Sequence, residues 1–456
     1  MFRVIARIGL FSLILILLTG PARAEEEEKT AVNPKVPGKK TLTRTEDFVI
    51  IHGEKLTKNL YNNISNMSLF AFTDGEIKPV PFQIDEINSE GEWVLPTIPH
   101  HLKDKDIKPD VDDDSGNLDR NDELVFMVRD SGDRIAKERY PEGAVAVDEI
   151  TLTDPIDGGK SWVYLCSFAE KPPLSDKDYV KYVFPEDQII SDSYTMGFTT
   201  ELPNSPSFIS IGGGENILDR MKIRFRMKAF GLPFSLDETN FLSELSLYKD
   251  GPIRIVRRIR TAIGFSKRFR TPSAAIENIY YSNSSAIPIR IQMPMSMKPF
   301  KRFIKINVRG GADFQNMDGW LLGTNVTPGW FNIDGKMDEA EKDIKNEGRG
   351  FDWFLASGPK DAFMIRIVLD RRPDGSLQKT PITTRLHYVD DKTVDDPPES
   401  VPGQTPHVGY WMDGIEELPK GTFYFYTIMH FVKDYKEGVE KDYLRILDKP
   451  IEVSVN

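Results

Sequence analysis

Short apolar runs separated by turn residues recur along most of the chain, and they predict β-strands. In residues 221–228 apolar and basic residues alternate at every position, which is the pattern of a strand that buries one face of a sheet. Comparable short runs predict further strands at 48–51, 69–72, 92–95, 123–128, 149–153, 253–263, 287–293, 303–309, 362–369 and 422–431. Only one short helix is expected, at 338–346. Many short strands with turns at near-regular spacing are typical of sandwiches and barrels, so the expected fold class is all-β with little helix.

The expected strands fall into two groups, on either side of a charged segment that contains two adjacent prolines. We therefore expect two β-sandwich-like domains, at residues 41–170 and 188–456, joined by a short linker at 171–187. An outer-membrane barrel is the main architectural alternative. The 31 prolines and the long acidic loops disfavour it, because each strand of such a barrel needs about ten residues of alternation.

The N-terminal residues have the pattern of a secretory signal peptide. Residues 1–24 combine the basic residues Arg3 and Arg7, a nine-residue apolar run broken only by Ser12, and an Ala-Arg-Ala cleavage site. The run is short for a membrane span, so an uncleaved anchor is the less favoured alternative. Residues 25–40 are expected to be a flexible leader. The protein is thus expected to be exported, to the periplasm or the extracellular space, with no transmembrane anchor after signal cleavage.

Composition narrows the class of protein further. Of the 456 residues, 39% are apolar and 28% are charged, which excludes a wholly disordered chain and a collagen. The single cysteine, Cys166, excludes an intramolecular disulfide. An exported protein without disulfides gains its rigidity from its core or from a metal ion. We expect the Cys166 thiol to be buried and structural.

An acidic segment in the first half of the chain has the composition of a calcium loop. Residues 110–123 hold seven carboxylates in 14 positions, offset only by Arg120. Like charges at this spacing repel one another, so an ordered loop here needs a cation or wide solvation. Calcium takes about six to eight oxygen ligands, many of them from carboxylates. The candidate metal ligands are Asp110, Asp112, Asp114, Asp119, Asp122 and Glu123.

The same segment resembles the calcium loops of EF-hand and dockerin-type modules, over these 14 residues and no further. If the twelve-residue template starts at Asp112, Asp114 takes its third position and Glu123 its last. If it starts at Asp110, the aspartates at the third and fifth positions also match, and Gly116 falls one residue after the turn position. The resemblance implies a structural Ca²⁺ that clamps the loop. The alternative is a solvated acidic loop without metal.

Positive charge is concentrated in one part of this acidic protein. The chain has a formal charge of −11, whereas residues 220–309 hold 19 Lys and Arg against five acids. Alternation places the basic residues of 221–228 on one strand face, and most of those in 253–263 share a face in the same way. If these strands are neighbours, they form a dense cationic surface. The candidate ligand-binding residues are Lys222, Arg224, Arg226, Lys228, Arg254, Arg258 and Arg260.

A cationic sheet face needs negative charge beside it, because like charges opposed across strands cost stability. One source is internal, from acidic segments of the same chain. The other is an anionic polysaccharide or another envelope component, since arginine binds carboxylate and phosphate bidentately. Nucleic acid is not an expected partner, because the protein is expected to be exported and is acidic overall.

Two functions are consistent with these features. The first is an exported, calcium-stabilised β protein that binds an anionic glycan or envelope component through a basic sheet face. The alternative is a carbohydrate-active enzyme, a lyase or hydrolase of acidic polysaccharide. A lyase needs cations to neutralise the uronate carboxylate and a base to remove the adjacent proton. Tyr280, Tyr281 or His407 could supply that base.

A segment rich in proline and aromatic residues, at 395–414, offers a further binding feature. Tyr410 and Trp411 could stack on sugar rings if this segment is a loop. Packing of these rings over the end of a sandwich is the favoured interpretation.

Overall fold

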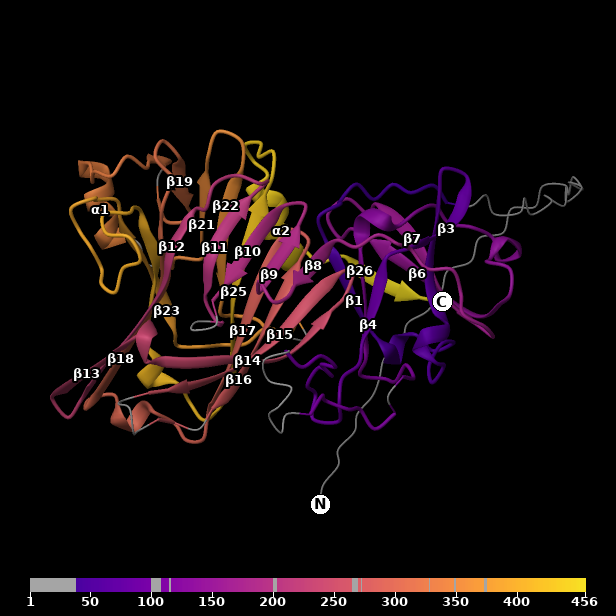
Figure 1. Ribbon diagram of the computed structural model, residues 1–456, viewed down its shortest axis with the longest axis horizontal. Helices are drawn as coiled ribbons and strands as arrows, with labels where there is room; N and C mark the ends of the chain where they lie inside the picture. The colour runs from indigo at the N-terminus through magenta and orange to yellow at the C-terminus, as the bar shows by residue number, and fades with distance from the viewer. Residues whose placement is uncertain are drawn as a thin grey trace, which may run out of the picture. The chain divides into compact units, whose positions relative to one another are not determined.

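Nearly all the regular structure of the chain is β, and the predicted all-β fold class is confirmed. The computed structural model (Figure 1) describes residues 38–99, 108–114, 116–199, 203–264, 270–271, 273–327, 329–347, 350–372 and 375–456. The predicted signal peptide and residues 25–37 of the predicted leader lie outside these ranges. The described helices of the α type are α1 (Glu339–Glu347) and α2 (Glu440–Asp448), and neither has the length and apolarity that a membrane-crossing helix needs.

Two antiparallel sheets come mainly from the first third of the chain. One has the order β26–β6–β7–β2–β3, with β2 (Met67–Thr73), β3 (Glu76–Val80), β6 (Ala144–Thr153), β7 (Lys160–Phe168) and β26 (Glu452–Val455). The other has the order β1–β5–β4, with β1 (Phe48–His52), β4 (Phe82–Asp85) and β5 (Glu123–Met127). Because β26 pairs with β6, the C-terminal strand joins a sheet made of N-terminal strands.

Three more antiparallel sheets form the rest of the protein. A four-stranded sheet has the order β11–β10–β9–β8, with β8 (Val180–Val183), β9 (Gln188–Ser191), β10 (Tyr194–Phe198) and β11 (Pro206–Ile211). A nine-stranded sheet has the order β14 (Phe241–Asp250), β15 (Arg254–Ile263), β16 (Ala274–Tyr281), β17 (Ser284–Met293), β25 (Gly421–Val432), β22 (Ala362–Val368), β21 (Trp353–Ser357), β19 (Leu321–Thr324) and β20 (Phe331–Asn332). The β12 sheet, as we call it, has the order β13 (Leu232–Asp237), β12 (Leu218–Ala229), β18 (Ile304–Phe314), β24 (His407–Asp413) and β23 (Thr383–Val389).

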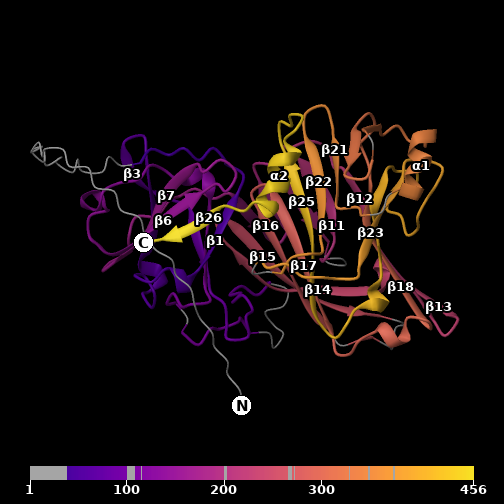
Figure 2. The same cartoon turned by 180° about the vertical axis from the view of Figure 1, so that it is seen from behind.

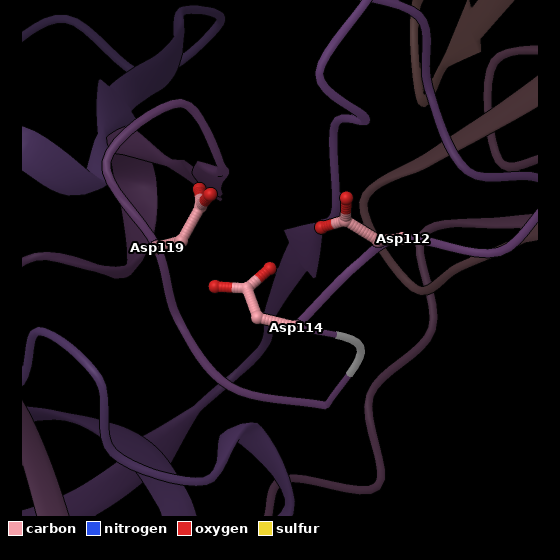
Figure 3. A group of neighbouring side chains, drawn as sticks. All are labelled: Asp112, Asp114 and Asp119. Carbon is pink, nitrogen blue, oxygen red and sulfur yellow. The ribbon is translucent and has the colours of Figure 1, made fainter.

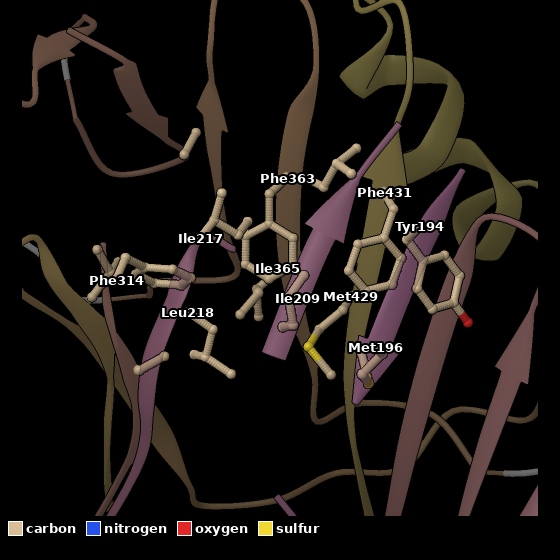
Figure 4. Close-up of a cluster of buried hydrophobic side chains, with 14 of the residues drawn as sticks. Tyr194, Met196, Ile209, Ile217, Leu218, Phe314, Phe363, Ile365, Met429 and Phe431 are labelled. Carbon is tan, nitrogen blue, oxygen red and sulfur yellow. The ribbon is translucent and has the colours of Figure 1, made fainter. Parts of the chain in front are cut away.

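The largest apolar core draws side chains from these three sheets (Figure 4). Phe363 of β22 lies at its centre, and its ring centroid is 5.6 Å from that of Phe314 on β18 and 5.6 Å from that of Phe431 on β25. Tyr194 of β10 stacks on the other side of Phe431, at 4.0 Å. Burial of rings this large supplies much of the free energy that holds sheets together. The β12 sheet therefore turns its apolar face inward and leaves its other face for polar side chains.

Most of the predicted elements are present, with one error. The predicted helix is α1, and the alternating strand at 221–228 lies within β12. The predicted strand at 92–95 is wrong, because Trp93 makes only an isolated bridge with Ile87. Its apolar residues are buried for a different reason: Leu95 packs against the nine-stranded sheet. Periodicity alone does not distinguish that kind of burial from strand pairing.

Residues 38–456 cluster as one compact unit. The predicted linker at 171–187 contains strand β8, which begins at Val180. The division into domains at 41–170 and 188–456 stays a prediction. Cys166 of β7 is buried, as predicted, and burial raises the pKa of its thiol to about 12. A thiol with that pKa is not a nucleophile at neutral pH.

Candidate functional site

The outward face of the β12 sheet carries a group of polar and charged side chains, which we call the polar face. The four basic residues of β12 lie on it together, as the alternation predicts. Strand register places further residues beside them, because directly paired residues point to the same side of a sheet. The polar face consists of Lys222, Arg224, Arg226, Lys228, Lys305, Asn307, Arg309, Asp313, His407, Trp411, Asp413, Arg385 and His387.

One half of the polar face is covered by the segment 394–399. Lys222 Nζ donates hydrogen bonds to the carbonyl oxygens of Asp396 and Pro398, at 2.5 Å each. The His407 ring nitrogen Nε2 lies 2.9 Å from the carbonyl oxygen of Val394. Main-chain oxygens of the segment are thus bound by side chains from two different strands of the sheet. The segment is a fixed part of the face rather than a loop beside it.

Buried ion pairs hold this covered half together. Lys222 is 2% exposed, and its Nζ lies 2.7 Å from Asp313 Oδ2 and 2.8 Å from Glu399 Oε2. His407 Nδ1 lies 2.5 Å from the other Asp313 oxygen. Asp219 completes a group of three carboxylates here. The Lys222 ammonium and the His407 imidazole bind oxygens of Asp313 and Glu399, and the Val401 N–H donates to Asp219 at 2.9 Å. We therefore interpret the group as an ion network and not as a metal site.

Arg224 and Arg309 extend the network across the face. Arg224 forms an ion pair with Glu238 and donates to the Pro397 carbonyl oxygen at 2.9 Å. Arg309 forms an ion pair with Asp396, and its Nη1 lies 2.9 Å from His387 Nε2. Burial, together with the neighbouring Arg224, lowers the pKa of Arg309 to about 10. Arg309 therefore stays charged at neutral pH.

Glu399 gives this network a pH dependence. Burial raises the pKa of Glu399 to about 7, Lys222 opposes that shift, and the neighbouring Asp313 adds to it. An unfolded glutamate titrates at about 4.3. A raised folded-state pKa contributes stability that is fully present below the unfolded pKa and is lost as the pH rises through the folded pKa.

The variant Glu399→Gln tests this contribution. It should have a free energy of unfolding that declines less between pH 5 and pH 8 than that of the wild type, because glutamine does not release a proton. Urea unfolding at pH 5, 6, 7 and 8 measures the difference. Equal declines in both proteins would contradict the raised pKa of Glu399.

The other half of the polar face is open to solvent. Trp411 is half-buried near its centre, and the Arg226 guanidinium lies over the indole with its Cζ 5.0 Å from the ring centroid. Arg226, Lys228 and Lys305 are exposed, and none of them forms an ion pair with the part of the chain that the structure describes. This half therefore combines a partly exposed indole, over which the Arg309 guanidinium also lies at 5.6 Å, with three cations that form no ion pair among the described residues.

A cleft of ≈ 550 Å³ adjoins the open half. Arg385 and Asp413 belong to both, and they pair with each other, with Arg385 Nε 2.6 Å from Asp413 Oδ2. Leu369 and Ile382 contribute apolar surface to the cleft, and Asp352 contributes a carboxyl group. A ligand that lies on Trp411 therefore has space and polar groups beside it.

The basic residues of β15 do not belong to this face, which corrects the expected single cationic surface. β15 lies in the nine-stranded sheet, away from β12 in the strand order. Arg254 is buried, with its Nη2 2.7 Å from Asp85 and 2.5 Å from Glu123. Arg258 is also buried and pairs with Asp110 and Glu277. Of the predicted β15 residues only Arg260 is exposed.

Lys222 and Arg224 need the same correction, because acids of the same chain already bind them. The internal source of negative charge thus accounts for four of the seven predicted ligand-binding residues: Lys222, Arg224, Arg254 and Arg258. Arg226, Lys228 and Arg260 remain exposed. Only Arg226 and Lys228 share a face with an accessible aromatic ring.

Three of the predicted metal ligands lie together in the acidic loop (Figure 3). One carboxylate oxygen from each of Asp112, Asp114 and Asp119 lies within 4.8 Å of the other two. Oxygens bound to one Ca²⁺ at about 2.3–2.6 Å are separated by distances of this size. Asp112 is 6% exposed, and its Oδ2 atom is buried without a hydrogen-bond partner. Burial raises the pKa of Asp112, and the carboxylates of Asp114 and Asp119 raise it further.

The remaining predicted ligands are engaged elsewhere. Asp110 pairs with Arg258, and Glu123 pairs with Arg254. Asp122 accepts backbone N–H groups of Ile87 and Asp119, at 3.0 and 2.8 Å, and burial raises its pKa to about 6. Asp110, Asp122 and Glu123 therefore anchor the two ends of the loop. Asp112, Asp114 and Asp119 lie between these ends.

The bases considered for a lyase are not placed to meet a substrate. Tyr280 and Tyr281 are 2% and 3% exposed, and their hydroxyls accept from Arg257 at 3.4 Å and Arg254 at 3.3 Å. His407 is buried in the ion network beside Asp313. A general base has to come within hydrogen-bond reach of the proton that it removes. No catalytic residue is assigned from this set.

Comparisons with known proteins identify no family. No family model matches the chain, and no curated protein matches it. An α-mannosidase from Enterococcus faecalis aligns with 91% of this chain and 46% of its own, at a TM-score of 0.40 and 9% identity. A putative aldose 1-epimerase from Escherichia coli aligns with 52% of this chain and 95% of its own, at a TM-score of 0.30 and 6% identity. The chain thus spans about half the length of the mannosidase. At such low TM-scores neither likeness assigns a function to this chain.

Proposed function

We propose that this protein is exported and that it binds an acidic carbohydrate on the open half of the polar face, around Trp411. One observation carries the proposal: a half-buried indole lies beside Arg226, which is exposed and forms no ion pair among the described residues. Sugar rings present C–H groups that pack on an indole, and guanidinium binds carboxylate with two parallel hydrogen bonds. Together the two groups suit a sugar ring that carries a carboxylate.

The residues around Trp411 extend the proposed site. Lys228 and Lys305 add positive charge along the same face, where strand register places them directly opposite each other. Asn307 and Asp413, which are bonded to each other, and Arg385 offer hydrogen-bonding groups of the kind that sugar hydroxyls use. Negative charge in the ligand would offset the repulsion between opposed cations. This site is smaller than the predicted one and lies on a single sheet.

Isothermal titration with a hexameric oligogalacturonate tests the site. Trp411→Ala and Arg226→Ala are each expected to weaken binding about tenfold, which corresponds to ~1.4 kcal/mol. Trp330→Ala and Arg260→Ala are the matched controls, because both side chains are exposed and lie outside the polar face. Controls that weaken binding as much as the site variants would rule out the polar face, as would site variants with unchanged affinity.

We also propose that Asp112, Asp114 and Asp119 hold a structural Ca²⁺. The close approach of three carboxylates and the unpartnered Oδ2 of Asp112 support this. Gly116 at φ +85° allows the sharp turn between the ligands. Asp110 and Glu123, at the two ends of the loop, bind arginines of β15. A cation here would therefore stabilise both the loop and its attachment to the nine-stranded sheet.

Chelation tests the calcium proposal. EDTA should lower the melting temperature, and millimolar Ca²⁺ should restore it, since a ligand at 100 times its Kd stabilises the folded state by ~2.7 kcal/mol. Asp114→Asn should reduce both effects. Glu339→Gln is the control, because it removes an exposed carboxylate from α1. Identical melting curves with and without chelator would exclude the site.

A further inference from the structure

An exposed apolar patch lies at the tip of the β12–β13 hairpin, which projects from the end of the β12 sheet in both views (Figures 1 and 2). Phe230 is 71% exposed, Leu232 is 75% exposed and Phe303 is 54% exposed. Phe230 and Phe303 stack on each other, with ring centroids 5.6 Å apart, and the Phe230 N–H donates to the Phe303 carbonyl oxygen. Met295 and Phe300, in the connection that leads to β18, are exposed as well. A contiguous exposed apolar patch of this kind marks an interaction surface.

The backbone at the tip of the hairpin has a conformation that phenylalanine rarely adopts. Phe230 and Gly231 form a two-residue turn with φ of +49° and +86°. Asparagine or aspartate is the residue that favours the first position of such a turn, because left-handed backbone is unfavourable for a bulky side chain. Phe230 is strained and exposed at the same time. Its ring thus belongs to the exposed apolar patch and not to the core.

Positive charge predominates near the patch. Strand register pairs Lys228 with Lys305 next to the tip. The connection that leads to β18 adds Lys298, Lys301 and Arg302. All five are exposed, and the residues 286–312 contain no acid. Among the described residues, these cations make one ion pair, Lys301 with Glu417, at 3.8 Å between exposed groups. Solvent screens such a pair almost completely. The apolar tip is therefore rimmed by positive charge.

We propose that this tip docks the protein onto the surface of an anionic lipid bilayer. Aromatic and aliphatic side chains that project from a basic rim enter the boundary between headgroups and acyl chains, while lysine and arginine meet the anionic headgroups. The positive charge around the tip favours an anionic bilayer over a neutral apolar surface as its binding partner. The proposal does not depend on carbohydrate binding at Trp411. The two surfaces share Lys228 and Lys305, so the tests leave both residues unchanged.

Sedimentation with lipid vesicles measures the docking. The full-length protein is mixed with vesicles of phosphatidylglycerol and phosphatidylcholine, at equal amounts, or of phosphatidylcholine alone. Binding to the anionic vesicles should be at least tenfold stronger, and it should fall as the salt concentration rises from 50 to 500 mM, because salt screens the headgroup charge. Equal binding to both kinds of vesicle overturns the proposal, as does no binding to either.

Two variants separate the apolar and the basic contributions. Phe230→Asn with Leu232→Ser should reduce vesicle binding at least tenfold without loss of melting temperature, because Asn-Gly suits the turn. Tyr61→Asn is the matched control: Tyr61 is also an exposed aromatic residue at positive φ, 62% exposed with φ +66°. Lys298→Gln with Lys301→Gln and Arg302→Gln should reduce binding several-fold and weaken its salt dependence.

Two further results would overturn the proposal. The first is unchanged vesicle binding in the Phe230→Asn, Leu232→Ser variant. The second is a wild-type dimer, seen by light scattering, that this variant converts to a monomer while vesicles bind neither form. The second result would make the tip a contact between two copies of the chain.

Discussion

Replacing Arg254 with methionine is expected to lower the free energy of unfolding by about 3–5 kcal/mol. Arg254 is 1% exposed and its guanidinium binds Asp85 and Glu123, which come from β4 and β5 of another sheet. Burial raises the pKa of Asp85, but Arg254 and Lys249 together hold it below its ordinary value. Without Arg254, Glu123 would be left near the interior with only the Trp93 N–H, at 3.2 Å, as a described hydrogen-bond donor.

Chemical unfolding monitored by circular dichroism measures this effect. Arg260→Met is the matched control, because Arg260 lies on the same strand and the same face but is exposed. It should change the free energy of unfolding by less than about 0.5 kcal/mol. A loss below 1 kcal/mol in Arg254→Met would show that Arg254 does not hold β15 to β4 and β5.

Replacing Lys222 with methionine is expected to have an effect of similar size, about 3–5 kcal/mol. Lys222 is the cation between Asp313 and Glu399, and it also binds two carbonyl oxygens of the segment over the polar face. Its loss would leave buried carboxylates close together. Because burial raises the pKa of Glu399 to about 7, that residue would be largely protonated at pH 5. The destabilisation should therefore be smaller at pH 5 than at pH 8.

Lys228→Met is the matched control for this variant, since Lys228 lies on the same strand and face and is exposed. Unfolding curves at pH 5 and pH 8 for both variants compare the two positions. If Lys222→Met and Lys228→Met were equally stable, the ion network would not stabilise the fold. A loss in Lys222→Met that does not change with pH would contradict the coupling to Glu399.

The β12 strand shows how far the sequence alone leads. Its strict alternation predicts correctly that Lys222, Arg224, Arg226 and Lys228 share one face. It does not predict which of them are covered, because the covering acids are distant in sequence. Glu399 is 177 residues from Lys222, and Asp85 is 169 residues from Arg254. Ion pairs between residues so far apart in sequence depend on the order of the strands in the sheets. Local periodicity does not predict that order.

Trp411 is a second residue whose environment the local sequence pattern does not predict. The proline-rich composition around it suggests a loop, whereas His407–Asp413 is strand β24, which lies between β18 and β23 in a sheet. The strand points Tyr410 inward, where its hydroxyl lies 3.1 Å from that of Thr427, and it points Trp411 outward. Tyr410 thus packs against the core, whereas sugar stacking on Trp411 stays a proposal. The alternation across a strand decides which ring points inward once the strand is known.

The acidic loop was predictable as a group of carboxylates but not residue by residue. Its composition predicted that some would approach one another, and Asp112, Asp114 and Asp119 do so. Asp110 and Glu123 instead meet arginines of β15. The sequence shows both clusters of opposite charge. It does not predict their contact with each other, because the intervening chain contains several strands of other sheets.

If the polar face recognises a negatively charged sugar, its affinity should depend on the charge of the ligand. Isothermal titration of the wild-type protein with a hexameric oligogalacturonate and with its fully methyl-esterified form compares a charged ligand with an uncharged one of the same length. The acidic hexamer should bind at least tenfold more tightly at low salt, and the difference should shrink at high salt because added ions screen the interaction. Equal affinity for both hexamers, or no measurable binding of the acidic one, would contradict the proposed function.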